Sequence, residues 1–151
     1  TSLICRAGWM MGGGPKKDKK FIQKIMVQLK DGATQLQIVN DKDGTPTYTH
    51  DFAVTVRELL EKELWGLYNC VCKGVTSRFE VAQELIRLLG KEKEVDLIPV
   101  SSDYFKDVYF ADRPPSERLI NKKLEMRGLN FMRNWREALK VYLEDYYQDY
   151  L

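Results

Sequence analysis

The chain has 151 residues, of which 44% are hydrophobic and 30% are charged, and its formal net charge at pH 7 is +2. These values describe one domain with a hydrophobic core, residues 1–151, and they exclude a disordered or low-complexity chain. The small net charge does not favour nucleic acid as a partner, and no apolar run is long enough to cross a membrane. No signal-peptide pattern is present, so we predict a cytoplasmic protein.

The first predicted element is a short strand at residues 2–6, which starts without a cap, a turn or a polar segment before it. A buried strand seldom begins a domain so abruptly, so we expect an interior strand of a larger sheet and interpret the chain as a fragment. In that case Leu3 and Ile4 form a poorly covered edge that favours self-association. The glycine run 12–14 with Pro15 is then predicted to break regular structure, and it matches no phosphate-binding glycine motif.

A basic cluster and an amphipathic helix follow the glycine run. The lysines at positions 16, 17, 19 and 20 are expected in a solvated loop. Helix 21–30 is predicted to stop at Gly32 and to be followed by a strand at 35–40. In the central turn, residues 44–51, we expect Gly44 to adopt a positive φ and Asp51 to cap helix 51–62. Helical spacing predicts a buried face on that helix from Phe52, Ala53, Val56, Leu59, Leu60 and Leu64.

Three hydroxyls lie at the strand-to-helix junction of the central turn, those of Thr47, Tyr48 and Thr49. Backbone N–H groups at the start of a helix favour anionic ligands, so these side chains are candidates for contact with a phosphate. The alternative, and the commoner role of such residues, is hydrogen bonding to the local backbone. The turn alone does not decide between the two.

The second half of the chain continues the alternation of strands and helices. A strand is predicted at 66–72, and Ser77 with Glu80 forms a capping box at the start of helix 78–89. A strand at 95–100, an irregular segment at 113–116 and helices at 122–127 and about 135–150 follow. The last helix carries a stripe of leucines and tyrosines that is typical of a core. The expected fold class is α/β, with short, mostly parallel strands covered by helices.

The three cysteines, Cys5, Cys70 and Cys72, do not indicate a disulfide framework, and we expect buried free thiols. Cys70 and Cys72 lie two residues apart, which is not the spacing of a zinc knuckle. His50 is the single histidine, so no ligand set can be assembled around it. No metal site is predicted.

Arg113 lies in the proline-rich segment, where its planar guanidinium can face a phosphate or a carboxylate in a fixed direction. It is therefore a candidate to bind a pyrophosphate. The alternative is a surface arginine that pairs with Asp112 or Glu117, and the sequence leaves this open.

Short segments form an ordered set along nearly the whole chain: LICR at 3–6 with Trp9, DKKFI at 18–22, DKDGTPTYTHDFA at 41–53, GLY at 66–68, SRFE at 77–80, ADRP at 111–114 and WREAL at 135–139. Together they resemble dTDP-4-dehydrorhamnose reductase, and the GTPT and ADRP blocks are the most specific pair. The resemblance is to the carboxy-terminal, sugar-nucleotide-binding half of that enzyme. It implies a Rossmann-like extended short-chain dehydrogenase/reductase fold from which the amino-terminal dinucleotide-binding part is absent.

The resemblance implies that the complete enzyme reduces a dTDP-linked 4-keto sugar with NADPH or NADH, completing dTDP-rhamnose. By the same resemblance, Arg6 and Trp9 border the sugar, Phe21 and Thr47 shape the nucleotide site, and Arg113 faces the diphosphate. The family relies on a Tyr-x-x-x-Lys pair and a glycine-rich cofactor turn, and neither pattern occurs in this sequence. We therefore expect no catalytic residue in this chain and no cofactor bound to it alone, and cofactor-binding residues are not predicted.

One departure from the family follows Arg113. The family usually continues Arg-Pro-x-Asn-Ser, whereas this chain has Ser116 and Glu117 at the last two positions. An acid here would repel a diphosphate unless it is turned away or paired with Arg118, so the sugar nucleotide stays undefined. The alternatives are the substrate half of another nucleotide-sugar epimerase or dehydratase, and a non-catalytic regulatory or binding subunit of the same fold.

Overall fold

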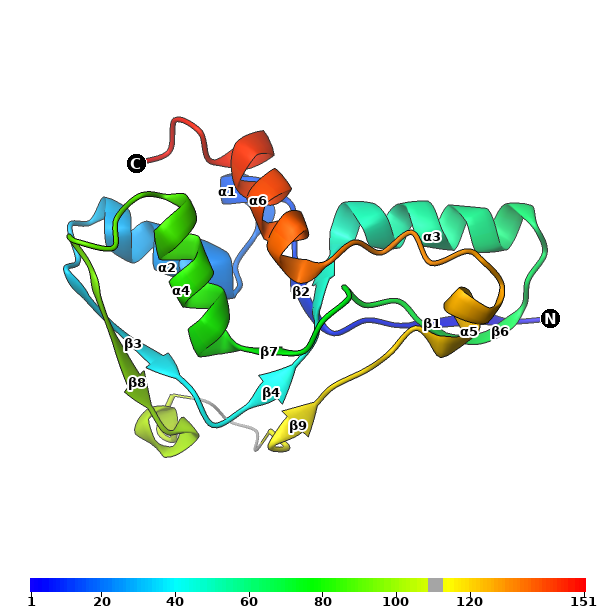
Figure 1. The fold of residues 1–151 in the computed structure, drawn as a ribbon, viewed down its shortest axis with the longest axis horizontal. Helices are drawn as coiled ribbons and strands as arrows, with labels where there is room; N and C mark the ends of the chain where they lie inside the picture. The colour runs from blue at the N-terminus through cyan, green and yellow to red at the C-terminus, as the bar shows by residue number, and fades with distance from the viewer. Residues whose placement is uncertain (109–112) are drawn as a thin grey trace.

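The computed structural model describes residues 1–108 and 113–151, in which helices and strands alternate along most of the chain (Figure 1). The helices are α1 (Gly14–Lys17), α2 (Phe21–Lys30), α3 (Thr49–Glu61), α4 (Arg78–Leu88), α5 (Lys122–Met126), α6 (Trp135–Tyr146) and the 3-10 helix η1 (Ser102–Phe105). The strands are β1 (Leu3–Arg6), β2 (Trp9–Met11), β3 (Gln35–Val39), β4 (Asp43–Gly44), β5 (Pro46–Tyr48), β6 (Gly66–Asn69), β7 (Thr76–Ser77), β8 (Asp96–Val100) and β9 (Ser116–Glu117).

The strands pair mostly in parallel. β1 pairs with β6, β2 with β5 and β3 with β8, each in parallel register. A further sheet places β4 between β7, which is antiparallel to it, and β9, which is parallel to it. The predicted α/β class with short, mostly parallel strands and covering helices is therefore confirmed.

The buried apolar side chains of the described residues form two clusters. The larger cluster includes Leu85 of α4 and Trp135 of α6, and the smaller one includes Leu59 of α3, Tyr68 of β6 and Leu124 of α5. Figure 1 shows the corresponding arrangement: α2, α4 and α6 gather at one end beside β3 and β8, while α3 and α5 lie beside β1 and β6 at the other. The short strands β4, β5, β7 and β9 lie between these two groups (Figure 1).

Several local predictions are confirmed. Ser77 and Glu80 form the capping box of α4 in both directions, with the Glu80 N–H donating to Ser77 Oγ at 3.1 Å. Gly32 follows α2 with a φ of 86°, in the left-handed region where glycine is favoured. The leucine and tyrosine stripe of α6 lies mainly in the core, although the helix ends at Tyr146 rather than near position 150.

The buried face of α3 differs from its prediction. The helix begins at Thr49 with Tyr48 at the N-cap, so Asp51 lies inside the first turn and does not cap the helix. Its buried residues are Asp51, Thr55 and Leu59, whereas Ala53 and Leu60, expected in the core, are exposed. The reason is that Asp51 is buried in an ion pair with Arg133, described below, and this pair turns a polar stripe inward where apolar spacing predicted a different face.

The extended segment expected at 66–72 is a strand only as far as Asn69. β6 ends there because its partner β1 ends at Arg6. Beyond this point the Cys70 N–H still donates to the Arg6 carbonyl at 2.8 Å, and the Asn121 side chain bonds both backbone groups of Val71. A side chain thus replaces the neighbouring strand as the hydrogen-bonding partner.

The glycine run leads into a one-turn helix that the sequence did not predict. The Gly14 N–H of α1 donates to the Tyr142 hydroxyl at 3.1 Å, and this hydroxyl donates to the buried carboxylate of Asp18 at 2.8 Å. A Cβ on Gly14 would lie 2.5 Å from the Tyr146 ring, so only glycine permits this approach. The lysines of the basic cluster are exposed, as expected.

Cys70 and Cys72 are buried free thiols, as predicted, while Cys5 is only partly buried. Burial raises the pKa of Cys70 and of Cys72 to about 12, which keeps both thiols protonated at neutral pH. No helix in the described part of the chain is long and apolar enough to span a membrane. Within residues 1–108 and 113–151, no three His, Cys, Asp or Glu side chains are grouped so as to hold a metal ion.

Candidate functional site

The candidate site is built around Trp9, the first residue of β2. The pairing of β2 with β5 places Trp9 opposite Pro46 of the central turn. The indole N–H of Trp9 donates to Oε2 of Glu117 at 3.0 Å. Gly44 approaches the ring so closely that a Cβ there would lie 2.5 Å from the indole atom Cζ2. Glycine is therefore required at position 44 by the close approach of Trp9, and not by the positive φ that the turn pattern predicted, because Gly44 has none.

The sheet β7–β4–β9 brings two further residues to this ring. Gly44 of β4 pairs with Thr76 of β7 on one side and with Glu117 of β9 on the other. Arg78 is the first residue of α4, directly after β7. Segments that are far apart in the sequence therefore place Arg78 and Glu117 beside Trp9.

Arg78 joins two of the residues that the sequence selected. Its guanidinium carbon lies 5.0 Å from the Trp9 ring centroid and 5.3 Å from the Phe21 ring centroid, within the range of cation–π attraction. Sequence reasoning treated Arg78 only as part of a capping motif. Its position next to the capping serine is visible in the sequence, but its contact with two distant aromatic rings depends on the tertiary fold.

Arg113 reaches the same cluster through Glu117. Its Nη1 lies 3.9 Å from Glu117 Oε1, and its carbonyl oxygen accepts a hydrogen bond from Lys42 Nζ at 2.7 Å. The side chain is 73% exposed, so the ion pair contributes little to stability. Of the two surface partners considered from the sequence, Glu117 is the one observed, and Asp112 lies outside the described residues.

The other two predicted site residues lie elsewhere. Thr47 is fully buried; its Oγ1 accepts a hydrogen bond from the Gly8 N–H at 2.8 Å and donates to the Cys70 carbonyl at 3.4 Å. Thr47 thus bonds to backbone groups, as in the alternative that the sequence left open, but these groups belong to distant segments and not to the turn itself. Arg6 is exposed at the end of β1, opposite Asn69. The structure thus brings Trp9, Phe21 and Arg113 together, but it does not add Thr47 or Arg6 to their cluster.

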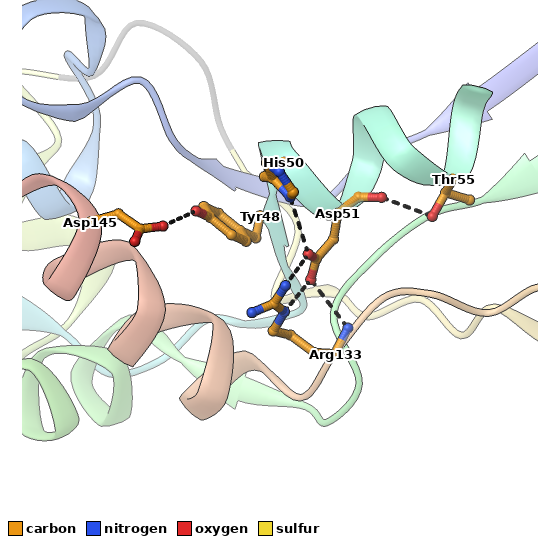
Figure 2. A network of polar contacts seen from close by, with 6 residues as sticks. All are labelled: Tyr48, His50, Asp51, Thr55, Arg133 and Asp145. Atoms are coloured by element: carbon orange, nitrogen blue, oxygen red, sulfur yellow. Dashed lines mark hydrogen bonds and ion pairs between the residues drawn. The ribbon is translucent and has the colours of Figure 1, made fainter. Parts of the chain in front are cut away.

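A separate polar network fixes the start of α3 (Figure 2). Arg133 donates to both carboxylate oxygens of Asp51, from Nη2 at 2.8 Å and from Nε at 2.9 Å, and Asp51 is 3% exposed. The Thr55 hydroxyl donates to the Asp51 carbonyl at 2.9 Å, and Figure 2 shows Tyr48 turned toward Asp145 of α6. These contacts tie α3, the segment before α6, and α6 itself together.

The charges in this network are stabilised by one another. Hydrogen bonding to Asp51 raises the pKa of the Arg133 guanidinium, so this side chain stays charged. Burial, and then the nearby Asp145 carboxylate, raise the pKa of Tyr48 to about 12, so its hydroxyl stays protonated. The network is therefore a structural joint between α3 and α6.

A shallow cavity of about 120 Å³ lies where the loop after β2 meets the start of α3. Lys17, Lys19 and Lys20 line it together with Thr49. Lys20 directly precedes Phe21, so this basic surface continues toward the Trp9 cluster. Guanidinium and ammonium groups beside aromatic rings suit an anionic ligand that also carries a flat ring.

Solved structures define the class of the fold. The chain superposes on the dTDP-4-dehydrorhamnose reductase of Yersinia enterocolitica with a TM-score of 0.86 and 34% identity, over 94% of this chain and 48% of that one. The reductase of Bacillus anthracis in complex with NADP gives a TM-score of 0.82 at 27% identity, over 95% of this chain and 48% of that one. A dTDP-glucose 4,6-dehydratase of the same organism, 17% identical with a TM-score of 0.69, covers 97% of this chain and 45% of its own and shows the fold alone. The chain has the α/β fold found in Rossmann-like extended short-chain dehydrogenases/reductases.

The sequence match defines the family. The model of the RmlD substrate binding domain matches residues 1–148, so the chain belongs to this family. Among its relatives are the Bacillus subtilis spore coat polysaccharide biosynthesis protein SpsK, 30% identical over 95% of this chain and 47% of that protein, and the dTDP-4-dehydrorhamnose reductase of Mycobacterium tuberculosis, 30% identical over 94% and 45%. The resemblance drawn from the sequence is confirmed. The chain spans about half the length of these relatives.

Proposed function

We propose that this chain supplies the sugar-nucleotide-binding part of a dTDP-4-dehydrorhamnose reductase that acts in dTDP-rhamnose formation. The observation that carries the proposal is the cluster in which Trp9 and Phe21 flank Arg78 while Arg113 lies beyond Glu117. Membership of the RmlD substrate binding domain family supports the choice of ligand. The names of the relatives support the choice of a dTDP-linked sugar.

In this proposal Arg113 contacts the diphosphate. Its side chain is exposed and, among the described residues, is paired with Glu117 at 3.9 Å, an ion pair weak enough to let it turn toward an incoming phosphate. A guanidinium can donate two parallel hydrogen bonds to phosphate oxygens, which a lysine cannot. The lysines beside Phe21 add a positive field that attracts the ligand.

The cofactor is assigned to another part of the complete protein. Gly12 and Gly13 precede a one-turn helix that starts at Gly14, and this run does not form the glycine-rich strand-turn-helix that holds a dinucleotide, so the residues of this chain do not fit NADPH. The sequence also has no tyrosine followed four residues later by lysine. Hydride and proton transfer are therefore not assigned to this chain. As a separate part of the proposal, we place the protein in the cytoplasm.

The same proposal includes a dinucleotide-binding part that lies against β1. Ile4 of β1 and Leu67 of β6 are register partners and are 57% and 41% exposed. Strands of parallel sheets are normally covered on both faces, so this face suits further strands of a nucleotide-binding sheet. The epimerase or dehydratase alternative has weaker support, because the dehydratase shares the fold at only 17% identity.

The proposal is tested by titrating the 151-residue chain with thymidine 5′-diphosphate in a calorimeter. We expect binding, and Arg113→Ala should weaken it about tenfold to a hundredfold, because a charge-assisted contact with phosphate is lost. Arg113→Lys should recover part of this loss, since it keeps the charge without the planar fork. Arg57→Ala is the matched control. Arg57, like Arg113, is exposed and paired with a glutamate, which in its case is Glu61 of the same helix. Equal affinity in the wild type and in Arg113→Ala would remove Arg113 from the site.

A further inference from the structure

Glu117 contacts both ends of the Trp9 cluster. Its Oε2 accepts the Trp9 indole N–H at 3.0 Å, and its Oε1 lies 3.9 Å from Arg113 Nη1. One carboxylate thus occupies the position between an N–H donor and a guanidinium. A phosphate group would compete with this carboxylate for the guanidinium.

The position of Glu117 is set by the backbone and not by a flexible loop. Glu117 belongs to β9 and pairs with Gly44 of β4, the residue that lies against the Trp9 ring. Its side chain is 33% exposed, whereas that of Arg113 is 73% exposed. The carboxylate is therefore the fixed member of the ion pair, and the guanidinium is the member that can move.

The neighbouring arginine does not neutralise this acid. Arg118, which the sequence offered as a partner for Glu117, donates from Nε to Ser116 Oγ at 2.8 Å. The acid is therefore not turned away from the site, and Arg113 is the cation paired with it in the described part of the chain.

We propose that Glu117 acts as an internal competitor for the diphosphate site. Its carboxylate holds Arg113 in the absence of ligand, and a diphosphate binds by taking Arg113 from it while the bond between Glu117 and the Trp9 indole stays in place. This inference rests on the function proposed above.

The exchange is feasible because the two bonds of Glu117 differ in strength. An exposed ion pair at 3.9 Å contributes little, so a phosphate that gives Arg113 two short hydrogen bonds displaces it readily. The indole hydrogen bond at 3.0 Å is better formed and more protected. Glu117 therefore stays near the bound phosphate and lowers its affinity by charge repulsion.

The test compares two substitutions at position 117 by titration with thymidine 5′-diphosphate. Glu117→Gln keeps an oxygen that accepts the indole N–H but removes the charge, so binding should tighten about threefold to tenfold. Glu117→Ala also removes the indole acceptor, so it should gain less and should shift the Trp9 indole N–H resonance in nitrogen–proton NMR spectra. That resonance is assigned with Trp9→Phe. Glu61→Gln, which removes the acid of the exposed Arg57–Glu61 pair, is the matched control and should leave affinity unchanged.

The role of Arg113 is isolated by a double substitution. In Arg113→Ala, the further change Glu117→Gln should tighten binding by a smaller factor than in the Arg113 protein, because only direct charge repulsion remains once the competition for Arg113 is gone. An undiminished gain in that background, or no gain in the Arg113 protein, would overturn the inference and leave the proposed function standing. If neither the wild type nor Glu117→Gln binds thymidine 5′-diphosphate, both the proposed function and this inference are wrong.

Discussion

At the scale of single residues, partners from distant parts of the chain decide the role of each charged side chain. Asp51 was expected to cap a helix, and for Glu117 the sequence left open a pairing with Arg118 or with Arg113. Asp51 instead pairs with Arg133, and Glu117 with Trp9 and Arg113. Local rules describe which partners a side chain can accept, but the fold selects among them.

The Asp51–Arg133 pair gives a stability prediction. Asp51→Asn keeps the size of the side chain and removes the charge, so Arg133 loses its bidentate partner in a largely buried position. We expect the free energy of unfolding to fall by about 2 to 3 kcal/mol. This loss is at or just below the low end of the range for broken buried ion pairs, because Arg133 is partly exposed. Urea unfolding followed by circular dichroism measures this loss.

The control for that measurement is Glu58→Gln, which breaks a more exposed contact with Arg57 on the outer side of the same helix. It should change the unfolding free energy by less than about 1 kcal/mol. If Asp51→Asn costs no more than this control, the network of Figure 2 is not a structural joint.

At the scale of elements, α4 connects a local sequence signal to the candidate site. Its capping box was visible in the sequence because both of its members lie within one helical turn. Arg78 is the residue next to the cap, so the angle at which α4 leaves β7 sets where its guanidinium lies. The cap therefore affects the position of Arg78 over the Trp9 ring as well as the stability of the helix.

Ser77→Ala tests this connection. Loss of the cap should lower the unfolding free energy by about 1 kcal/mol, measured by urea unfolding. It should also shift the Trp9 indole resonance, because Arg78 lies over that ring. Ser2→Ala, at an exposed position before β1, is the control and should do neither. A normal Trp9 resonance in a destabilised Ser77→Ala protein would mean that the stack does not depend on the cap.

The sequence predicted the elements that carry a long apolar periodicity or a local capping motif. It did not predict the short paired strands. The helices α2 and α4 were predicted within a residue of their observed ends, because apolar spacing and stop or cap residues mark them. Strands β4, β7 and β9 have two residues each, too few for any periodicity, and they position Gly44, Arg78 and Glu117. The site was therefore only partly predictable: its residues Trp9, Phe21 and Arg113 came from the family resemblance, and their connection through Arg78 and Glu117 came from the fold.

At the scale of the whole molecule, the two hydrophobic clusters differ in how well they are covered. The larger cluster is enclosed by α2, α4 and α6. The smaller one is covered by α3 and α5, yet Ile4 and Leu67 remain exposed on the adjacent β1–β6 pair. A parallel pair of only two strands is marginal by itself, so this surface is the natural place for association.

Self-association through β1 is the prediction at this scale. Ile4 is 57% exposed beside its register partner Leu67, and a second copy that covered both side chains would remove this apolar surface from water. We expect the sedimentation coefficient of the wild-type chain to rise with concentration, and Ile4→Lys to abolish that rise, because a charged side chain opposes burial of the face. Val27→Lys makes the same change on α2, at the other end of the molecule, and should leave the association intact. If the sedimentation coefficient of the wild type does not change with concentration, or if both variants lose the association equally, β1 is not the contact.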